Sequence, residues 1–204
     1  MQRRSFLKSC AATLALSVFA SAAQAQELSL NALSQYLNGL VTAQGGFTQI
    51  NPDGTLSTGQ IYIKRPGRIR FEYNAPDNSL LVAGGGQVAI FDPRSNIGPD
   101  RYPLNQTPLN IILERNVDLA QRNMVTGRTS DGTSTTITAQ DPENPQYGNS
   151  QLVFTANPTE LRQWVVTDNT GAQTTVILND LVTGTSIPDN RFNIIREMRD
   201  RGFE

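Results

Sequence analysis

The stretch GQIYIKRPGRIRFEYNAPDNSLLVAGGGQVAIFDP, which runs from Gly59 to Pro93, alternates apolar and polar side chains between groups of turn residues. Alternation with a period of two indicates strands that bury one face, and the Pro-Gly, Ala-Pro-Asp and triple-glycine sequences indicate tight turns. The pattern therefore predicts four consecutive antiparallel strands: Gly59–Lys64, Arg68–Tyr73, Leu80–Ala83 and Val88–Phe91.

The same period continues on both sides of this stretch. Further strands are predicted at 47–50, 124–129, 133–139, 151–155, 161–168, 173–180 and 191–194, with turn sequences such as NPDGT, SDGT and DNTGAQ between them. About ten short strands without regular helical crossovers are typical of a barrel or a large curved sheet. We expect a mainly β fold in which a curved antiparallel sheet carries small helices.

Two helices interrupt the strand pattern. Helical spacing of Leu30, Leu33, Leu37 and Leu40 predicts an amphipathic helix from Ser29 to about Thr42, ended by Gly45-Gly46. A second, short helix is expected in NQTPLNIILERN, where Thr107 is a good N-cap and Pro108 a good first residue. Its apolar stripe consists of Leu109, Ile112 and Leu113.

Two small helices over one wide sheet leave two interpretations of the interior. A filled sandwich would make the helices ordinary core elements. An unfilled space between sheet and helices would instead hold an apolar ligand.

The first 25 residues have the form of an export signal. Arg3, Arg4 and Lys8 precede an apolar run from residue 11 to 20, and AQA at 23–25 is a small-x-small cleavage site. The RR-x-F-L-K sequence resembles a twin-arginine signal, and the general secretory route stays open as the alternative. We expect cleavage after Ala25, a periplasmic location, and a single domain over residues 26–204.

Composition excludes several classes of function. The chain has no histidine, and its one cysteine, Cys10, lies in the signal, so the mature protein can form no disulfide, His-based triad or usual zinc site. Three of the 17 basic residues also lie in the signal, which leaves a mature charge of 14 − 18 = −4. A mildly acidic protein is not a general nucleic-acid binder. We expect no metal and no cofactor.

The sequence does not favour catalysis. Asp92, Asp168 and Asp180 could form an acid/base set, but each is expected at a strand end, where aspartate is an ordinary turn residue. The AGGGQ sequence precedes a strand rather than a helix, so it predicts a hairpin and not a phosphate loop. We expect no enzyme activity.

Four cations surround the Pro66-Gly67 corner, and strand parity separates them. Three of them, Lys64, Arg68 and Arg70, fall on polar faces, whereas Arg65 continues the apolar register of Ile61 and Ile63. An arginine beside an apolar face needs acceptors, and the unpaired carbonyls at a helix C-terminus would supply them. Arg65 is thus either a fastener between the sheet and a covering helix or a surface-paired arginine, and parity leaves both open.

Taken in order, these pieces resemble the LolA family of periplasmic outer-membrane lipoprotein carriers. The resemblance lies in the export signal, the amphipathic helix leading into GGFTQI, the Gly59–Pro93 block, the TPLNIIL helix, LRQWVVTDNTGAQTTVILNDL, and IPDNRFNI near the end. It covers most of the mature chain. The family's usual C-terminal sequence is replaced here by IIREMRDRGFE, which leaves the pairing of the last strand undetermined.

The resemblance implies a half-open β-barrel whose apolar face is closed by a helical lid and receives the acyl chains of a lipoprotein. The cargo would come from an inner-membrane lipoprotein-releasing ABC transporter and pass to an outer-membrane acceptor, with the carrier a monomer. Arg65 corresponds to the arginine that holds the lid closed, Leu37 to a lid leucine, and Ile69 to an apolar sheet position. The implied lid and lipid-binding residues are Leu33, Leu37, Leu40, Leu109, Ile112 and Leu113 against Ile61, Ile63, Ile69 and Phe71.

Two alternatives to a lipoprotein carrier stay open at this point. The cavity could carry another lipid. The chain could also be a protein-interaction module of the cell envelope with a filled core and no lipid ligand.

Overall fold

The computed structural model describes residues 27–120 and 123–203, so the predicted export signal lies outside the described residues. Its main feature is an 11-stranded sheet, as a mainly β sequence pattern predicts. The strands are β1 (Thr42–Ile50), β2 (Leu56–Lys64), β3 (Ile69–Tyr73), β4 (Leu80–Gly84), β5 (Gln87–Phe91), β6 (Asp100–Pro103), β7 (Val125–Ser130), β8 (Ser134–Gln140), β9 (Asn149–Thr155), β10 (Glu160–Thr167) and β11 (Gln173–Thr183). The helices are α1 (Leu30–Gly39), α2 (Asn110–Leu113) and α3 (Ile194–Asp200), with 3-10 turns η1 (Leu104–Gln106), η2 (Pro145–Tyr147) and η3 (Asp189–Phe192).

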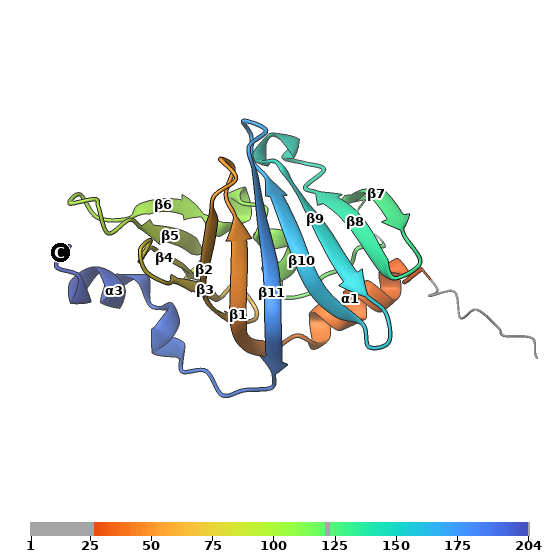
Figure 1. Ribbon diagram of the computed structural model, residues 1–204, viewed down its shortest axis with the longest axis horizontal. Coiled ribbons are helices and arrows are strands. Elements are labelled where there is room, and N and C mark those ends of the chain that lie inside the picture. The colour runs from red at the N-terminus through yellow and green to blue at the C-terminus, as the bar shows by residue number, and fades with distance from the viewer. Residues whose placement is uncertain (1–26, 121–122, 204) are drawn as a thin grey trace, which may run out of the picture.

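The sheet consists of two meanders joined along one pair of strands. Its order is β6-β5-β4-β3-β2-β1-β11-β10-β9-β8-β7, and neighbouring strands are antiparallel. The first and last strands, β1 and β11, pair at the centre, while β6 and β7 form the two edges. The sheet is strongly curved and does not close on itself (Figure 1). The expected half-open barrel is therefore confirmed.

The two faces of the sheet carry different helices. On one face, α1 and residues 104–120, which we call the lid, share a single apolar core with the sheet. The opposite face of β4 and β5 forms a smaller cluster with α3, because alternate residues of a strand point to opposite sides. Figure 1 shows α1 near β8–β10 and α3 at the other end of the molecule, near β4.

The first helix ends earlier than predicted. Its N-cap is Ser29, whose hydroxyl accepts from the Ala32 N–H, but it ends at Gly39 with Leu40 as C-cap. Gly45 and Gly46 lie inside β1, where the register with β11 shifts between Gln44 and Gly46. A side chain at Gly45 would meet the Asn179 carbonyl oxygen at 2.8 Å, so this glycine allows a close approach within the sheet and does not end the helix.

Two further expectations are wrong, and one strand was not predicted. The segment predicted as a strand at 191–194 forms η3 and the start of α3, because the Asn193 side chain caps α3 by accepting from the Arg196 N–H at 2.9 Å. Thr107 does not cap α2 with its side chain, since its hydroxyl donates instead to the Leu104 carbonyl at 2.8 Å. Strand β6 was missed because its residues are all exposed and show no alternation.

Candidate functional site

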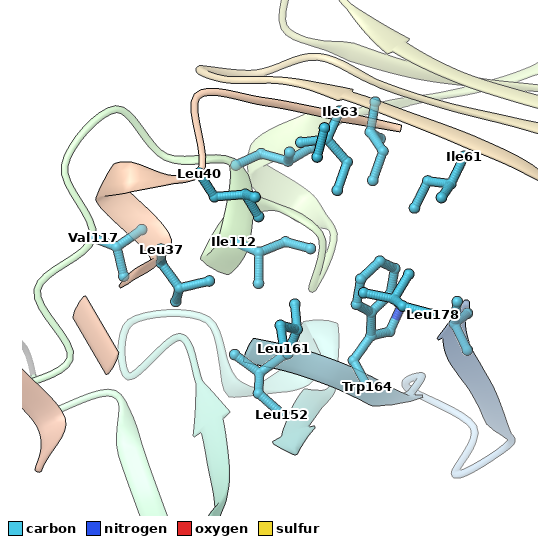
Figure 2. Close-up of a cluster of buried hydrophobic side chains, with 14 of the residues drawn as sticks. Leu37, Leu40, Ile61, Ile63, Ile112, Val117, Leu152, Leu161, Trp164 and Leu178 are labelled. Carbon is cyan, nitrogen blue, oxygen red and sulfur yellow. The ribbon is translucent and has the colours of Figure 1, made fainter. Parts of the chain in front are cut away.

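The core between lid and sheet brings the predicted lid and lipid-binding residues together. Side chains from α1, α2, β2 and β9–β11 converge there, with Val117 of the lid beside Leu37 (Figure 2). The sequence-predicted residues in the core are Leu33, Leu37, Leu40, Ile61, Ile63, Ile69, Phe71, Ile112 and Leu113, all buried, and Leu109 packs against it partly exposed. The lid therefore covers the apolar face of the sheet in this structure.

Side-chain hydrogen bonds join the two parts of the lid. The Asn38 side-chain amide forms a reciprocal pair with Val117, donating to its carbonyl and accepting from its N–H, each at 2.9 Å. One turn earlier, the Ser34 hydroxyl accepts from the Leu119 N–H at 3.0 Å and donates to the Leu30 carbonyl. These contacts join α1 to residues 117–119 within the lid.

Arg65 connects the sheet to both parts of the lid. Its side chain is 7% exposed, and its Nη2 donates to the backbone carbonyl of Glu114, the C-cap residue of α2, and to Asn38 Oδ1 at 3.3 Å. Burial lowers the pKa of the Arg65 guanidinium, and the nearby Glu114 charge opposes that effect. The described residues offer its buried Nε no hydrogen-bond partner, so within them the guanidinium is only partly satisfied.

The other three cations of the same corner bind the C-terminal segment, residues 189–203, on the opposite face. Lys64 and Arg68 both contact Asp189 at 2.6 Å. Arg70 donates to Glu197 Oε2 at 2.9 Å and to Glu72 at 2.6 Å. The corner therefore binds the lid with one cation and the C-terminal segment with three.

An open apolar pocket of about 420 Å³ continues from the core toward one end of the sheet. Phe71, Trp164 and Leu109 belong both to its lining and to the core or its immediate neighbours. Its lining comes from β1, β3–β6 and β10–β11, together with lid residues 107–109. Its volume falls in the range of small-molecule sites.

The model of the family described as outer membrane lipoprotein carrier protein LolA matches residues 38–195. The chain belongs to the LolA family. An outer-membrane lipoprotein carrier protein of Chromohalobacter salexigens is 28% identical over 191 residues, 89% of this chain and 88% of that protein. One of Azotobacter vinelandii is 37% identical over 78 residues, 38% of its length. A crystal structure of a LolA superfamily protein from Nitrosomonas europaea, 11% identical, covers 81% of this chain and 98% of its own with a TM-score of 0.46.

LolA proteins are carriers and not enzymes, and two of the three aspartates named as an acid/base set, Asp92 and Asp168, have structural roles here. Asp92 binds the Arg94 guanidinium through both carboxylate oxygens at 3.0 Å, and Asp168 caps its turn by accepting from Thr170. These bonds hold the pKa of both carboxyls below the usual range. The AGGGQ sequence forms the β4–β5 hairpin, as predicted.

Within this LolA chain, sequence reasoning missed the wall that lies opposite the Gly59–Pro93 block. It is formed by residues of β9–β11, namely Leu152, Phe154, Leu161, Trp164, Val176 and Leu178. Period-two alternation marks most of them, but the register shift between Leu161 and Gln163 breaks the parity in β10. Asn38 was also missed, because the sequence does not show which distant backbone groups its side-chain amide will hydrogen-bond. Among the described residues, no helix is long and apolar enough to cross a membrane.

Proposed function

We propose that this chain is a periplasmic carrier that binds the acyl chains of lipoproteins released from the inner membrane and delivers them to the outer membrane. The observation that supports it most is that the lid, α1 and residues 104–120, covers an apolar face of the sheet, and that this face continues into an open apolar pocket. The proposal takes residues 1–25 as a cleaved signal and 26–204 as one domain. It carries over the family's partners, an inner-membrane ABC transporter and an outer-membrane acceptor, with the carrier as a monomer.

In this proposal, lid and cargo compete for the same surface. Acyl chains would displace Leu37 and Ile112 from Ile61 and Ile63, and Arg65 would act as the latch of the closed state. Each methylene group that leaves water contributes about 0.8 kcal/mol. Each lid hydrogen bond contributes about 1 kcal/mol. In this proposal, acyl burial offsets both the lid hydrogen bonds and the burial of the lid side chains that the chain displaces, and a partner that offers an alternative apolar site can recover the cargo.

Native mass spectrometry with lipid extraction tests this function. Wild-type protein and the Arg65→Leu variant would be purified from the periplasm, with Arg68→Leu as control because Arg68 binds Asp189 on the opposite face. We expect acylated polypeptide on the protein and several-fold more of it on Arg65→Leu, since loss of the latch weakens the closed state that competes with cargo. Arg68→Leu should resemble wild type.

Three results would count against the proposal or a part of it. Phospholipid or another lipid as the sole ligand would keep the cavity and replace the cargo. Absence of lipid from all three proteins would favour a protein-interaction module, and equal loading of Arg65→Leu and wild type would remove the latch role.

A further inference from the structure

The lining of the apolar pocket carries a single charge. Among the described residues around this pocket, Asp77 is the only one with an ionisable acid or base that is charged at neutral pH. The remaining polar groups are neutral: Gln49, Ser79, Thr107 and Thr174, with the phenols of Tyr73 and Tyr102. No lysine or arginine takes part in the lining, so the local charge at this site is negative.

Several polar residues of the pocket lie at one end of the sheet. Gln49 and Tyr73 lie at the C-terminal ends of strands β1 and β3, and Thr174 lies at the start of β11. Together with Asp77 of the β3–β4 turn, these residues form what we call the polar rim of the pocket. The Tyr73 hydroxyl donates to Gln49 Oε1 at 2.7 Å. Burial, and then the charge of Asp77, raise the pKa of Tyr73 to about 12, so the rim stays neutral apart from Asp77.

Local hydrogen bonds fix the Asp77 carboxylate at this rim. Ser57 Oγ donates to Oδ2 at 3.1 Å, and both the N–H and the hydroxyl of Ser79 donate to Oδ1. Asp77 also borders a polar groove, which runs past Asn51 and Asn74 on its other side. The cation of that groove, Arg94, is exposed and bound to Asp92 through two of its three guanidinium nitrogens, and the charge of Asp77 acts on it only as the last of several influences on its pKa.

We propose that the pocket selects acyl chains attached through neutral linkages to a polypeptide, and that Asp77 excludes lipids with anionic headgroups. This inference rests on the proposed carrier function and specifies its ligand. Ester and amide groups of an acylated polypeptide can lie beside a carboxylate without repulsion, and the peptide could continue into the polar groove. A phosphodiester headgroup would place a second negative charge beside Asp77 in a partly desolvated site, which is unfavourable.

A binding comparison tests the selection with two ligands of matched chain length: a synthetic triacylated cysteinyl lipopeptide and phosphatidylglycerol. We expect Asp77→Asn to raise the affinity for phosphatidylglycerol roughly tenfold, the effect of removing one nearby like charge. Lipopeptide affinity should change less than about twofold, because asparagine keeps the Oδ1 acceptor for Ser79. The control is Asp131→Asn, which removes the same charge from a similarly capped turn between β7 and β8, outside the pocket.

Salt provides a test that needs no variant. Raising the salt concentration screens the partly exposed carboxylate, so wild-type protein should gain affinity for phosphatidylglycerol, while Asp77→Asn should gain less. Unchanged selectivity in Asp77→Asn, or an equal change in Asp131→Asn, would overturn the role of Asp77 while leaving the carrier function intact. Failure of every variant to bind either acyl ligand would overturn the carrier function itself.

Discussion

Lys64 and Arg65, next to Pro66, contact different parts of the molecule, because a strand directs successive side chains to opposite faces. Lys64 reaches the Ile187 carbonyl at 2.7 Å on the outer face, whereas Arg65 is buried against the lid. Four similar cations in the sequence therefore have two different environments. Parity in the sequence indicated this separation, but the latch role of Arg65 stays a proposal until transfer is measured.

Gly84 shows how a single missing side chain admits the C-terminal segment. A Cβ at this position would overlap the backbone carbonyl oxygen of Phe192, which crosses the end of β4. We expect Gly84→Ala to lower the free energy of unfolding by about 1–3 kcal/mol, as overpacking does. Urea denaturation followed by circular dichroism would measure it.

The matched control is Gly39→Ala at the end of α1, where nothing lies within 4 Å of the added methyl group. This change should be neutral or stabilising by up to about 1 kcal/mol, since alanine favours helix over glycine. A Gly84→Ala protein as stable as Gly39→Ala would show that the Phe192 backbone does not require this glycine.

At the scale of elements, α3 and the segment around it depend on charge pairs as well as apolar contacts. Ile194, with Met198 and Phe203, packs on the outer face of β4 and β5. Glu197 binds Arg70 at 2.9 Å and Arg201 at 2.9 Å. Burial alone would raise the pKa of Glu197, but hydrogen bonds and charges from the two arginines outweigh it and lower the pKa.

This pKa shift predicts a pH dependence. A carboxyl with a lowered folded-state pKa stabilises the fold above the ordinary glutamate pKa of about 4.3, and this stability is lost as pH falls through the folded value. Glu197→Gln should therefore lower the free energy of unfolding by about 1–2 kcal/mol at pH 7, and the difference from wild type should disappear well below pH 4. Thermal unfolding measured across pH would test it.

A suitable control is Glu160→Gln, which removes an exposed partner of Arg162 on β10. Exposed pairs contribute little, so it should match wild type within about 0.5 kcal/mol at every pH. A Glu197→Gln effect that is constant with pH would contradict the ion-pair explanation.

Whether a segment forms a helix or a strand could be predicted wherever apolar residues recur at helical or at strand spacing over several residues. The strands of the Gly59–Pro93 block and α1 followed from that signal. The C-terminal helix did not, although Asn193 as a cap and the spacing of Ile194 and Met198 were available, because a seven-residue helix offers less than two apolar turns. Strand β6 had no signal, since an exposed edge buries neither face.

At the scale of the whole molecule, the site depends on contacts between distant segments that periodicity cannot specify. Which side chains face the interior could be predicted from sequence, and these residues do share one core. The pairing of β1 with β11 brings Trp164 opposite Phe71, with ring centroids 6.1 Å apart. Neither that pairing nor the pocket between the two meanders could be derived from local patterns, because curvature and closure depend on the entire sheet.

The central claim is that acyl chains occupy the space between lid and sheet. Trp164, the only tryptophan of the chain, is 2% exposed and lines both the core and the pocket, so its fluorescence reports on that space directly. The most direct measurement is a titration of the mature protein with a triacylated lipopeptide whose acyl chains carry bromine, which quenches tryptophan on contact. Saturable loss of Trp164 fluorescence is predicted, reached at lower ligand concentration in Arg65→Leu. Binding of the lipopeptide without quenching would place the acyl chains elsewhere and contradict the account.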